Sequence, residues 1–506
     1  MKIRVSERKT TTSAEPTDTQ VTPGLRTLAF IDGAYVPSVS GATYPVRNPA
    51  TGRILSQVTA CNAADVDRAV MSARRAFEDG RWSRKSPRER KLILLRFADL
   101  IDSNLEELAL LETVNVGKPL NDSRSLDVPK AAYMIRWYAE AIDKLYGDVA
   151  PTAEHALAFV TREPLGVIGA VIPWNFPLYL AAYKLGPALA TGNSVVLKPA
   201  DQTPLTALRI AGLAREAGLP DGVLNVVPGL GTTAGAALGL HPEVDCIAFT
   251  GSPAVARHFM RYSADSNLKR VQIEGGGKSP HIVLRDAEDL DRIAHEATWG
   301  IFYNQGQVCS AGSRLIVEEP LVEELVSRIV KLAAEIRVGD PLDPDTQLGA
   351  LVDARQCERV GDRVRAGVNE GARLAFGGRQ LLKTSGGWFF EPTIFVEVEN
   401  SMSIAREEIF GPVLSVIACR DADHAIRIAN DSVYGLGAAV WSQNINRALN
   451  TARSLRAGIV WVNNYDAGDL TVPWGGFKMS GTGRDKSLEA VNEYTASKAT
   501  WIELRQ

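Results

Sequence analysis

One cysteine stands in a setting that suits a nucleophile. Cys309 lies in the polar, glycine-rich segment NQGQVCSAGS, between an expected helix (289–303) and an expected strand (314–317). A loop position exposes the sulfur, and neighbouring backbone N–H groups can stabilise a thiolate. By contrast, Cys246 and Cys419 lie in apolar strands, where a thiol is usually a small buried side chain. No histidine is placed for a papain-like pair, so an activating base must come from elsewhere.

Three polar residues lie where expected strands end. Glu274 ends the run RVQIE and meets three glycines, which makes it a candidate general base or a turn-stabilising carboxylate. Asn175 lies in PWNFP directly after the strand GVIGAVI, where its amide either donates to an oxyanion or closes an Asx turn. Lys198 ends NSVVLKP and either holds a ribose or phosphate or is solvated.

Two glycine-rich runs fall short of known phosphate-binding motifs. The run from Gly229 to Gly235 misses the G-x-G-x-x-G spacing by one residue and follows a strand in the middle of its domain. The run GGGKS at 275–279 lacks the earlier glycine of a Walker motif, because Gln272 occupies that position. Gly229 is kept as a candidate cofactor contact, but the usual dinucleotide fingerprint is absent.

The elements around these residues indicate an α/β fold. A hairpin is expected over 27–37 with its turn at Asp32-Gly33, and helices over 63–79 and from Ser86-Pro87 toward Gly117. From residue 157 onward, Val- and Ile-rich runs alternate with helical segments, which predicts a doubly wound parallel sheet. Such sheets bind ligands beyond the carboxyl ends of their strands. The expected strands are 166–172, 193–199, 222–229, 245–251 and 270–275, with helices at 178–189, 203–217 and 253–264.

A second α/β region is expected from about 280 to 478. Its predicted strands are SRLIVEE, PVLSVIACR, GLGAAVW and AGIVWVNN. The segment 488–506 predicts a helix and then a strand, ASKATWIEL, whose alternation suits pairing with 157–163 or with a neighbouring subunit.

Composition limits the functional classes. The chain has 506 residues and a net charge of −3, so no overall field favours nucleic acid or an anionic membrane. No apolar run reaches the ~18 residues that span a bilayer. The first 24 residues are polar and lack the apolar core of a secretory signal, which predicts a disordered tail. Five widely spaced cysteines without C-x-x-C, and six scattered histidines, favour a reducing cytoplasm and give no support for a metal site.

Several ordered motifs resemble those of the aldehyde dehydrogenase superfamily, from about residue 25 to the end. They are PWNFP (173–177), LKPADQTP (197–204), FTGS (249–252), IEGGGKSP (273–280), FYNQGQVCSAGSR (302–314), EEIFGPV (407–413) and PWGGFKMSG (473–481). Within the superfamily the chain looks most like the ω-aminoaldehyde group, which includes γ-glutamyl-γ-aminobutyraldehyde and guanidinobutyraldehyde dehydrogenases. That closer likeness lies in IRWYAEAIDKLYG (135–147), NNYDAGDLTVPWGG (463–476) and SGTGRDKSL (480–488).

The resemblance implies a role for each matching residue. Cys309 would be the nucleophile and Glu274 the general base, with the Asn175 side chain and the Cys309 N–H as oxyanion donors. The implied cofactor contacts are Lys198 at the adenosine ribose, Trp174 and Ser252 along the pyrophosphate, Glu408 at the nicotinamide ribose and Phe410 beside the ring. The family fold implies an NAD(P)-binding domain (25–145 and 165–276), a catalytic domain (277–478) and an oligomerisation region (148–164 and 485–506). It also implies a homodimer or homotetramer.

The chain departs from the family pattern at three places. Asp201 follows LKPA where many NAD-using relatives have Glu, so NAD is favoured and NADP stays open. Pro253 and Ala256 in GSPAVA (251–256) remove a backbone donor and add a methyl near the expected pyrophosphate. The triple glycine after Glu274 is looser than the usual pattern and would let that loop move.

The substrate class follows from what would bind an amine. An ammonium group is held by aromatic faces and carboxylates. The aromatic candidates are Tyr303, Tyr465 and Trp474, and the acidic candidates are Asp127, Asp466 and Asp469, each of which is otherwise a loop cap. The alternatives are an aliphatic or betaine aldehyde dehydrogenase, a CoA-dependent acylating enzyme, and a catalytically silent scaffold on this fold.

Overall fold

The computed structural model describes residues 11–12 and 24–505. The predicted disordered tail, residues 1–24, therefore lies outside the described residues except for β1 (Thr11–Thr12) and Gly24. Among the described residues, no helix combines the length and the apolar character needed to cross a membrane.

A seven-stranded sheet carries the predicted doubly wound strands. Its order is β12-β11-β8-β9-β10-β2-β3, and the first five strands are parallel. The hairpin turns at Asp32 (φ +53°) and Gly33 (φ +76°), as the Asp-Gly signal predicts. The strands are β2 (Ala29–Ile31), β3 (Ala34–Val36), β8 (Val167–Val171), β9 (Ser194–Lys198), β10 (Leu224–Val226), β11 (Cys246–Thr250) and β12 (Arg270–Glu274).

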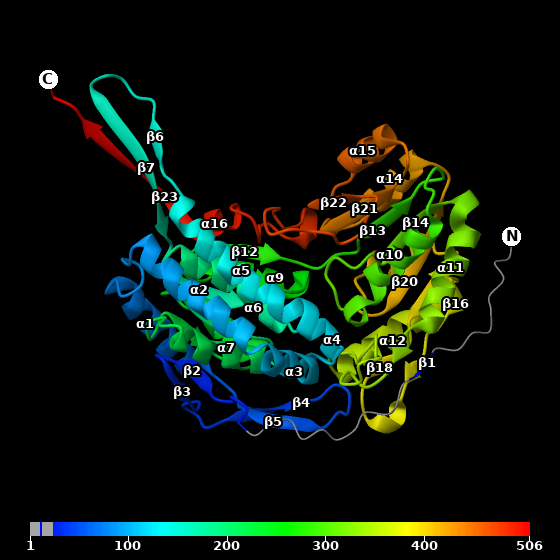
Figure 1. Cartoon of the computed structure of the whole chain (residues 1–506), viewed down its shortest axis with the longest axis horizontal. Helices are drawn as coiled ribbons and strands as arrows, with labels where there is room; N and C mark the ends of the chain where they lie inside the picture. The colour runs from blue at the N-terminus through cyan, green and yellow to red at the C-terminus, as the bar shows by residue number, and fades with distance from the viewer. Residues whose placement is uncertain (1–10, 13–23, 506) are drawn as a thin grey trace.

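Helices cover both faces of this sheet (Figure 1). On one face α6 (Pro177–Ala190) and α7 (Leu205–Glu216) pack against the strands, and α2 (Pro87–Ser103) and α5 (Val128–Ala141) cover these two helices. The other face packs against α1 (Ala63–Glu78), α8 (Ala236–Leu240) and α9 (Pro253–Ala264). The prediction of a single helix from Pro87 toward Gly117 is wrong.

The break in that helix has a local cause. The chain forms α2 and then α3 (Leu105–Val116), which are separated at Asn104. Asn104 leaves the helical conformation at φ −106°, and its side-chain amide donates to the Leu100 carbonyl at 2.8 Å. An asparagine that bonds to nearby backbone competes with the helix in this way.

A second seven-stranded sheet lies beside the first one. Its order is β16-β19-β20-β14-β13-β21-β22, with β16 antiparallel to β19 and the other pairs parallel. The four strands expected in this region are confirmed as β14, β20, β21 and β22. The bounds are β13 (Pro280–Val283), β14 (Arg314–Glu318), β16 (Arg373–Phe376), β19 (Thr393–Val396), β20 (Val413–Cys419), β21 (Gly437–Trp441) and β22 (Ile459–Val462).

The helices of this second layer again cover two faces. α10 (Leu290–Phe302) and α11 (Val322–Glu335) pack on one face, and α12 (Ala354–Asn369) and α14 (Ala422–Asn430) on the other. Other elements include β4 (Thr43–Arg47), β5 (Ile54–Thr59), α4 (Leu120–Asp122), β15 (Arg337–Val338), β17 (Gln380–Leu381), β18 (Phe389–Phe390), α13 (Ser403–Arg406), α15 (Ile445–Ser454) and α16 (Ala490–Glu493).

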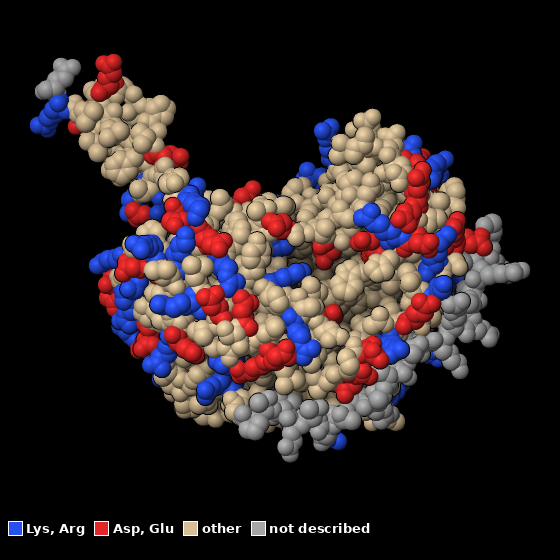
Figure 2. Space-filling view, viewed as in Figure 1, with Lys and Arg blue, Asp and Glu red and all other residues tan. Residues whose placement is uncertain are grey.

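A third sheet forms an arm that projects from the body (Figure 1). β23 (Thr495–Glu503) pairs antiparallel with β7 (Ala156–Pro164) along nine residues, and β7 pairs with β6 (Asp148–Ala150). The expected pairing of ASKATWIEL with 157–163 is confirmed. The middle of the arm carries few charged side chains on the face in Figure 2, whereas both signs intermingle over the body.

The α/β fold class is confirmed. Each predicted domain contains one of these three sheets, but the domain bounds themselves stay a prediction.

Candidate active site

The candidate site lies between the two large sheets. Asn175 and Ser252 lie in the loops that follow β8 and β11, and Lys198 and Glu274 are the last residues of β9 and β12. Cys309 differs from these residues because it precedes β14 and so approaches from the amino end of the second sheet. A cavity of about 260 Å³ lies here, and both Cys309 and Asn175 line it.

A sharp bend delivers Cys309 to this cavity. Asn304 (φ +48°), Gln305 (φ +58°) and Gly306 (φ +70°) are consecutive left-handed residues after α10, in η4 (Tyr303–Gly306). A Cβ at position 306 would lie 2.2 Å from the Gly411 carbonyl oxygen, so glycine is required there. Left-handed non-glycine residues cost energy and tend to gather at functional sites.

The thiol of Cys309 is more enclosed than the sequence predicts. Cys309 is half-buried, and burial raises the pKa of its thiol to about 12. The carboxyl groups of Glu408, Asp466 and Glu274 raise that pKa further, and the Ser310 backbone N–H opposes them. The residue is therefore only partly exposed, although the other four cysteines are buried, and the raised pKa favours the neutral thiol at rest.

Asn175 faces the cysteine loop. Its Nδ2 donates to the Gln307 carbonyl at 2.8 Å, and Asn304 Nδ2 donates to the Asn175 carbonyl at 3.1 Å. These bonds tie the loop after β8 to the bend before Cys309. The Asn175 side chain thus bonds across to another segment instead of closing an Asx turn, and one N–H of its amide makes no bond within the described residues.

Glu274 is a buried carboxyl group at the end of β12. Among the described residues, neither of its side-chain oxygens has a hydrogen-bond partner. Burial raises the pKa of Glu274 well above its usual value; Asp485 adds to the shift, while Lys184 and Arg484 oppose it. A carboxyl group without local bonds does not stabilise a turn, so the turn-stabilising alternative finds no support.

Sequence reasoning missed a charged pair close to Glu274. Lys184 Nζ lies 2.6 Å from Asp485 Oδ2, and both side chains are fully buried. Gln272 Nε2 also donates to Asp485, at 3.1 Å. Two signals were available in the sequence, a lysine inside the otherwise apolar α6 and the motif SGTGRDKSL that contains Asp485.

The three glycines after Glu274 hold tight contacts. Gly275 N donates to the Ser480 carbonyl at 2.7 Å, and Gly277 N donates to Glu408 Oε1 at 3.0 Å. A Cβ at Gly276 would lie 2.1 Å from Glu408, and one at Gly277 would lie 2.5 Å from the Cys309 carbonyl oxygen. The glycines allow this close approach. The loop that was expected to move is therefore held in place by these contacts.

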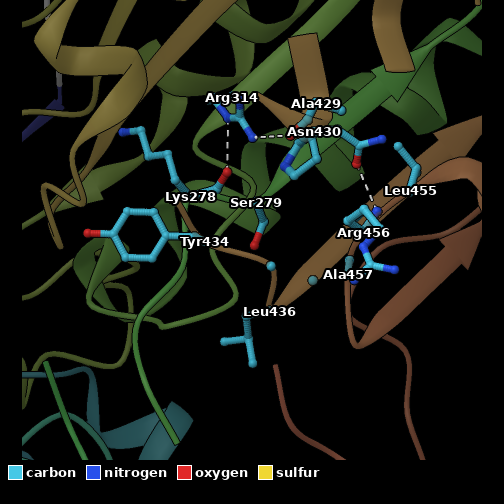
Figure 3. A pocket seen from close by; sticks show the side chains of 14 residues that line it. Lys278, Ser279, Arg314, Ala429, Asn430, Tyr434, Leu436, Leu455, Arg456 and Ala457 are labelled. Carbon is cyan, nitrogen blue, oxygen red and sulfur yellow. Dashed lines mark hydrogen bonds between the residues drawn. The ribbon is translucent and has the colours of Figure 1, made fainter. Parts of the chain in front are cut away.

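Arg314 holds the end of this loop onto the second sheet (Figure 3). Its fully buried guanidinium donates to the carbonyls of Lys278 (2.9 Å), Ile428 (3.0 Å) and Ala429 (2.9 Å), and to Asn400 Oδ1 (3.1 Å). Burial lowers the pKa of Arg314 to about 10, which still leaves it cationic at neutral pH. Arg314 therefore links the loop to the carboxyl end of α14.

The residues at and beyond the end of β9 suit a dinucleotide. Lys198 is buried, has no ion-pair partner among the described residues, and has its pKa lowered by burial to about 8, opposed by nearby Asp201. A buried cation without a partner is costly unless a ligand supplies one. Trp174 and Phe410 pack edge to face at 5.1 Å, a pair of rings that can border a planar group. The residues present therefore fit NAD.

Three expected cofactor residues have local contacts of their own. The Ser252 hydroxyl caps α9 by accepting from Val255 N at 3.4 Å. Glu408 turns toward Gly277, and burial raises its pKa to about 7. Gly229 packs on backbone, since a Cβ there would lie 2.8 Å from the Cys61 carbonyl oxygen. Each of these residues therefore has a structural role in addition to its expected contact with the cofactor.

Comparisons with known proteins decide the family. The sequence pattern of the aldehyde dehydrogenase family matches residues 35–500. The chain belongs to the aldehyde dehydrogenase family. It is an oxidoreductase that acts on an aldehyde and uses a nicotinamide cofactor.

The similar proteins span nearly the whole chain. The NADP/NAD-dependent aldehyde dehydrogenase PuuC of Escherichia coli K12 is 50% identical over 475 residues, which is 94% of this chain and 95% of PuuC. A γ-glutamyl-γ-aminobutyraldehyde dehydrogenase from Burkholderia cenocepacia is 53% identical with a TM-score of 0.94, covering 96% of this chain and 98% of that one. An indole-3-acetaldehyde dehydrogenase solved with NAD+ is 54% identical with a TM-score of 0.95 and the same coverage, 96% and 98%.

The pocket of this aldehyde dehydrogenase has an aromatic wall. Tyr303 and Trp474, both predicted from the sequence, line it, but Tyr465 does not. Tyr465 is buried behind the pocket, where its hydroxyl donates to the Ser310 carbonyl at 2.5 Å and its ring stacks on His281. The residues lining the aromatic wall are Tyr133, Phe176, Tyr179, Tyr183, Tyr303 and Trp474.

The three predicted carboxylates line the pocket but differ in how many local bonds and ion pairs they already make. Asp127 is buried against Lys118 at 2.6 Å, so its charge is already paired. Asp469 accepts from the backbone N–H and the hydroxyl of Thr471, which is the loop-cap alternative predicted from the sequence. Asp466 accepts one long bond of 3.3 Å from Ser310 Oγ. Of the three, Asp466 has the weakest local bonding.

Proposed function

We propose that this aldehyde dehydrogenase uses Cys309 to oxidise an aldehyde with an amine-bearing tail to the carboxylic acid. The observation that carries the proposal is that Cys309 and the Asn175 amide line one cavity, with the Glu274 carboxyl group close enough to raise the pKa of the thiol. Covalent aldehyde oxidation requires a nucleophile and an oxyanion donor in one cavity with a base nearby.

The residues then act in sequence. Cys309, once deprotonated, attacks the aldehyde carbon, and the resulting oxyanion accepts hydrogen bonds from Asn175 Nδ2 and from the Cys309 backbone N–H. One such donor contributes about 3 kcal/mol to transition-state stabilisation. Hydride acceptance is the chemistry that NAD supplies when bound, and loss of the hydride leaves a thioester on Cys309. Glu274, as the carboxylate, takes a proton from the water that hydrolyses this thioester.

NAD is the proposed cofactor, with NADP as the alternative. The residues that would hold it are Lys198, Asp201, Trp174, Glu408 and Phe410. Asp201 lies near enough to Lys198 to raise the pKa of that lysine. A carboxylate at this position accepts from ribose hydroxyls and repels a 2′-phosphate, which supports NAD.

An amine-bearing substrate is favoured over a simple aliphatic one by the pocket wall. Aromatic rings and Asp466 suit an ammonium group. Two similar proteins carry names that refer to aminoaldehydes, the γ-glutamyl-γ-aminobutyraldehyde dehydrogenase and an aminoacetaldehyde dehydrogenase of Pseudomonas aeruginosa that is 50% identical over 476 residues. The same rings suit an aryl aldehyde, the substrate in the name of the indole-3-acetaldehyde enzyme. Glu274 as a base for water argues against acyl transfer to CoA.

One assay tests the proposal. NADH or NADPH formation is followed with γ-glutamylaminobutyraldehyde, aminobutyraldehyde, betaine aldehyde, indole-3-acetaldehyde and propanal, with the Cys309→Ala variant as control. We expect the highest kcat/KM on an aminated aldehyde with NAD, and no turnover by the variant. A highest value on propanal or the indole aldehyde contradicts the substrate class, and acyl-CoA formation contradicts hydrolysis. No turnover at all indicates a silent scaffold.

The proposed location is the cytoplasm, and the proposed oligomeric state is a homodimer or homotetramer. The projecting arm supports association, because its Trp501 (66% exposed) and Val149 (72% exposed) lie open in the single chain. The cysteine spacing that favours a reducing compartment supports the cytoplasm.

A further inference from the structure

Two lysines that the sequence reasoning did not single out line the same pocket as Cys309. Lys130 comes from α5, and Lys486 from the segment that follows Asp485. Neither has a carboxylate within ion-pair distance among the described residues. Lys486 Nζ lies over the rings of Trp474 (4.7 Å) and Tyr183 (5.6 Å), and Lys130 Nζ lies 6.0 Å from the ring of Tyr179. Their ammonium groups are therefore available to an anionic ligand.

The backbone aims Lys486 at the pocket. Trp474 and Asp485 exchange two backbone hydrogen bonds of 2.7 Å, and Ser487 N donates to the Leu470 carbonyl at 2.7 Å. Between these anchors Lys486 adopts φ +59°, a left-handed conformation that is uncommon for a side-chain-bearing residue. Asp485 is bound to Lys184 on one side of this segment, so the next side chain enters the cavity over Trp474.

The charges around the cavity balance. The charged residues lining it are Asp127, Lys130, Asp466, Asp469 and Lys486. Asp127 is neutralised by Lys118, which lies outside the lining. Two carboxylates and two ammonium groups are left. Burial lowers the pKa of Lys486; Asp466 opposes that shift and Lys130 adds to it, so both groups lie near Lys486.

A plain ammonium tail does not match this wall. It would pair with Asp466 but would leave Lys130 and Lys486, which have no carboxylate within ion-pair distance among the described residues, without a partner, and like charges that share a site repel. A tail with a carboxylate and an ammonium group leaves both signs paired. We propose that Lys130 and Lys486 are specificity residues that bind a carboxylate at the far end of the aldehyde, so that the preferred substrate has a zwitterionic, amino-acid-like tail. This inference rests on the proposed function and narrows its substrate class.

A matched set of four aldehydes tests the proposal. Each is an amide of 4-aminobutyraldehyde: the γ-glutamyl amide has both charges, the glutaryl amide the carboxylate alone, the 4-aminobutanoyl amide the amine alone, and the butanoyl amide neither. With the intact enzyme and NAD we expect kcat/KM to be highest for the γ-glutamyl amide. We expect the glutaryl amide to exceed the 4-aminobutanoyl amide.

Variants of the two lysines then test whether these residues bind the substrate carboxylate. Lys486→Met and Lys130→Met keep the side-chain length and remove the charge. Each is expected to lower kcat/KM for the γ-glutamyl and glutaryl amides by about 10- to 100-fold relative to the butanoyl amide, mainly through KM, because a charge-assisted hydrogen bond is lost. Lys486→Arg is expected to keep part of the preference. Lys331→Met, which removes an exposed lysine on α11, is the control.

The outcomes separate the two proposals. An equal loss on all four amides in the lysine variants overturns the specificity role, because it indicates a general effect on Cys309 or on the fold. Equal kcat/KM for the four amides in the unmodified enzyme does the same and leaves the proposed aldehyde oxidation standing. If the unmodified enzyme oxidises no member of the set with either cofactor but oxidises propanal, the amine-bearing substrate class itself fails.

Discussion

At the scale of single residues, the enclosed thiol of Cys309 predicts low reactivity at rest. With its pKa near 12, the thiolate fraction stays small at neutral pH, and it grows as the pH rises toward that value. We therefore expect the rate of alkylation by iodoacetamide to increase about tenfold per pH unit from pH 7 to 10 without a plateau. Mass spectrometry of the labelled peptide, with Cys309→Ala as control, measures it. A plateau below pH 8 would show that the site stabilises the thiolate.

Glu274 carries a second prediction at this scale. If it activates the hydrolytic water, Glu274→Gln removes the second half-reaction and spares the first. We expect a burst of NADH close to one equivalent per subunit, followed by steady turnover reduced by about 100-fold or more, the size of a general-base contribution. Stopped-flow absorbance resolves the two phases. Glu216→Gln, an exposed change on α7, serves as control. Loss of the burst itself would assign Glu274 to the attack by Cys309.

At the scale of elements, Arg314 is the part that holds the loop after Glu274. Arg314→Met leaves the carbonyls of Lys278, Ile428 and Ala429 without a donor, each at a cost of about 1–3 kcal/mol. We expect a fall of several degrees in the Tm and a lower kcat, because Gly277 and Cys309 pack on that loop. Circular dichroism on heating and the standard assay measure both. The control is Arg453→Met on the exposed side of α15. A lower kcat at an unchanged Tm would contradict this bracing role.

At the scale of the whole molecule, the arm predicts association. A three-stranded sheet that projects from the body with open edges and apolar side chains is stable when another surface covers it. We expect Val149→Glu combined with Trp501→Glu to shift the protein to monomer in analytical ultracentrifugation. Ile445→Glu, equally apolar and exposed but on the opposite lobe, should not do so (Figure 1). A monomeric unmodified protein, or an oligomer that survives the double change, would place the interface elsewhere.

Many of the secondary-structure elements of this protein can be predicted from local sequence. Val- and Ile-rich runs, the Asp-Gly turn and the helix start at Ser86-Pro87 are signals that depend on nearby residues, and the structure places strands, a hairpin and a helix at those positions. Parallel strands direct their carboxyl ends to one edge, which is why Asn175, Lys198 and Glu274 could be grouped before the structure was known. The order of the family motifs determined the fold and the class of reaction.

Tertiary structure decided which of these groups are free to act. In the sequence Asp127 is a candidate for binding an amine, but in the structure it is paired with Lys118. Tyr465 is likewise a candidate pocket residue, but its hydroxyl donates to the Ser310 carbonyl behind the pocket. The enclosure of the Cys309 thiol, the Lys184–Asp485 pair and the entry of Lys486 beside Lys130 all join segments far apart in the chain. Burial and charge pairing depend on neighbours in space, so local sequence determines where a group stands along an element, and packing determines its charge and its partners.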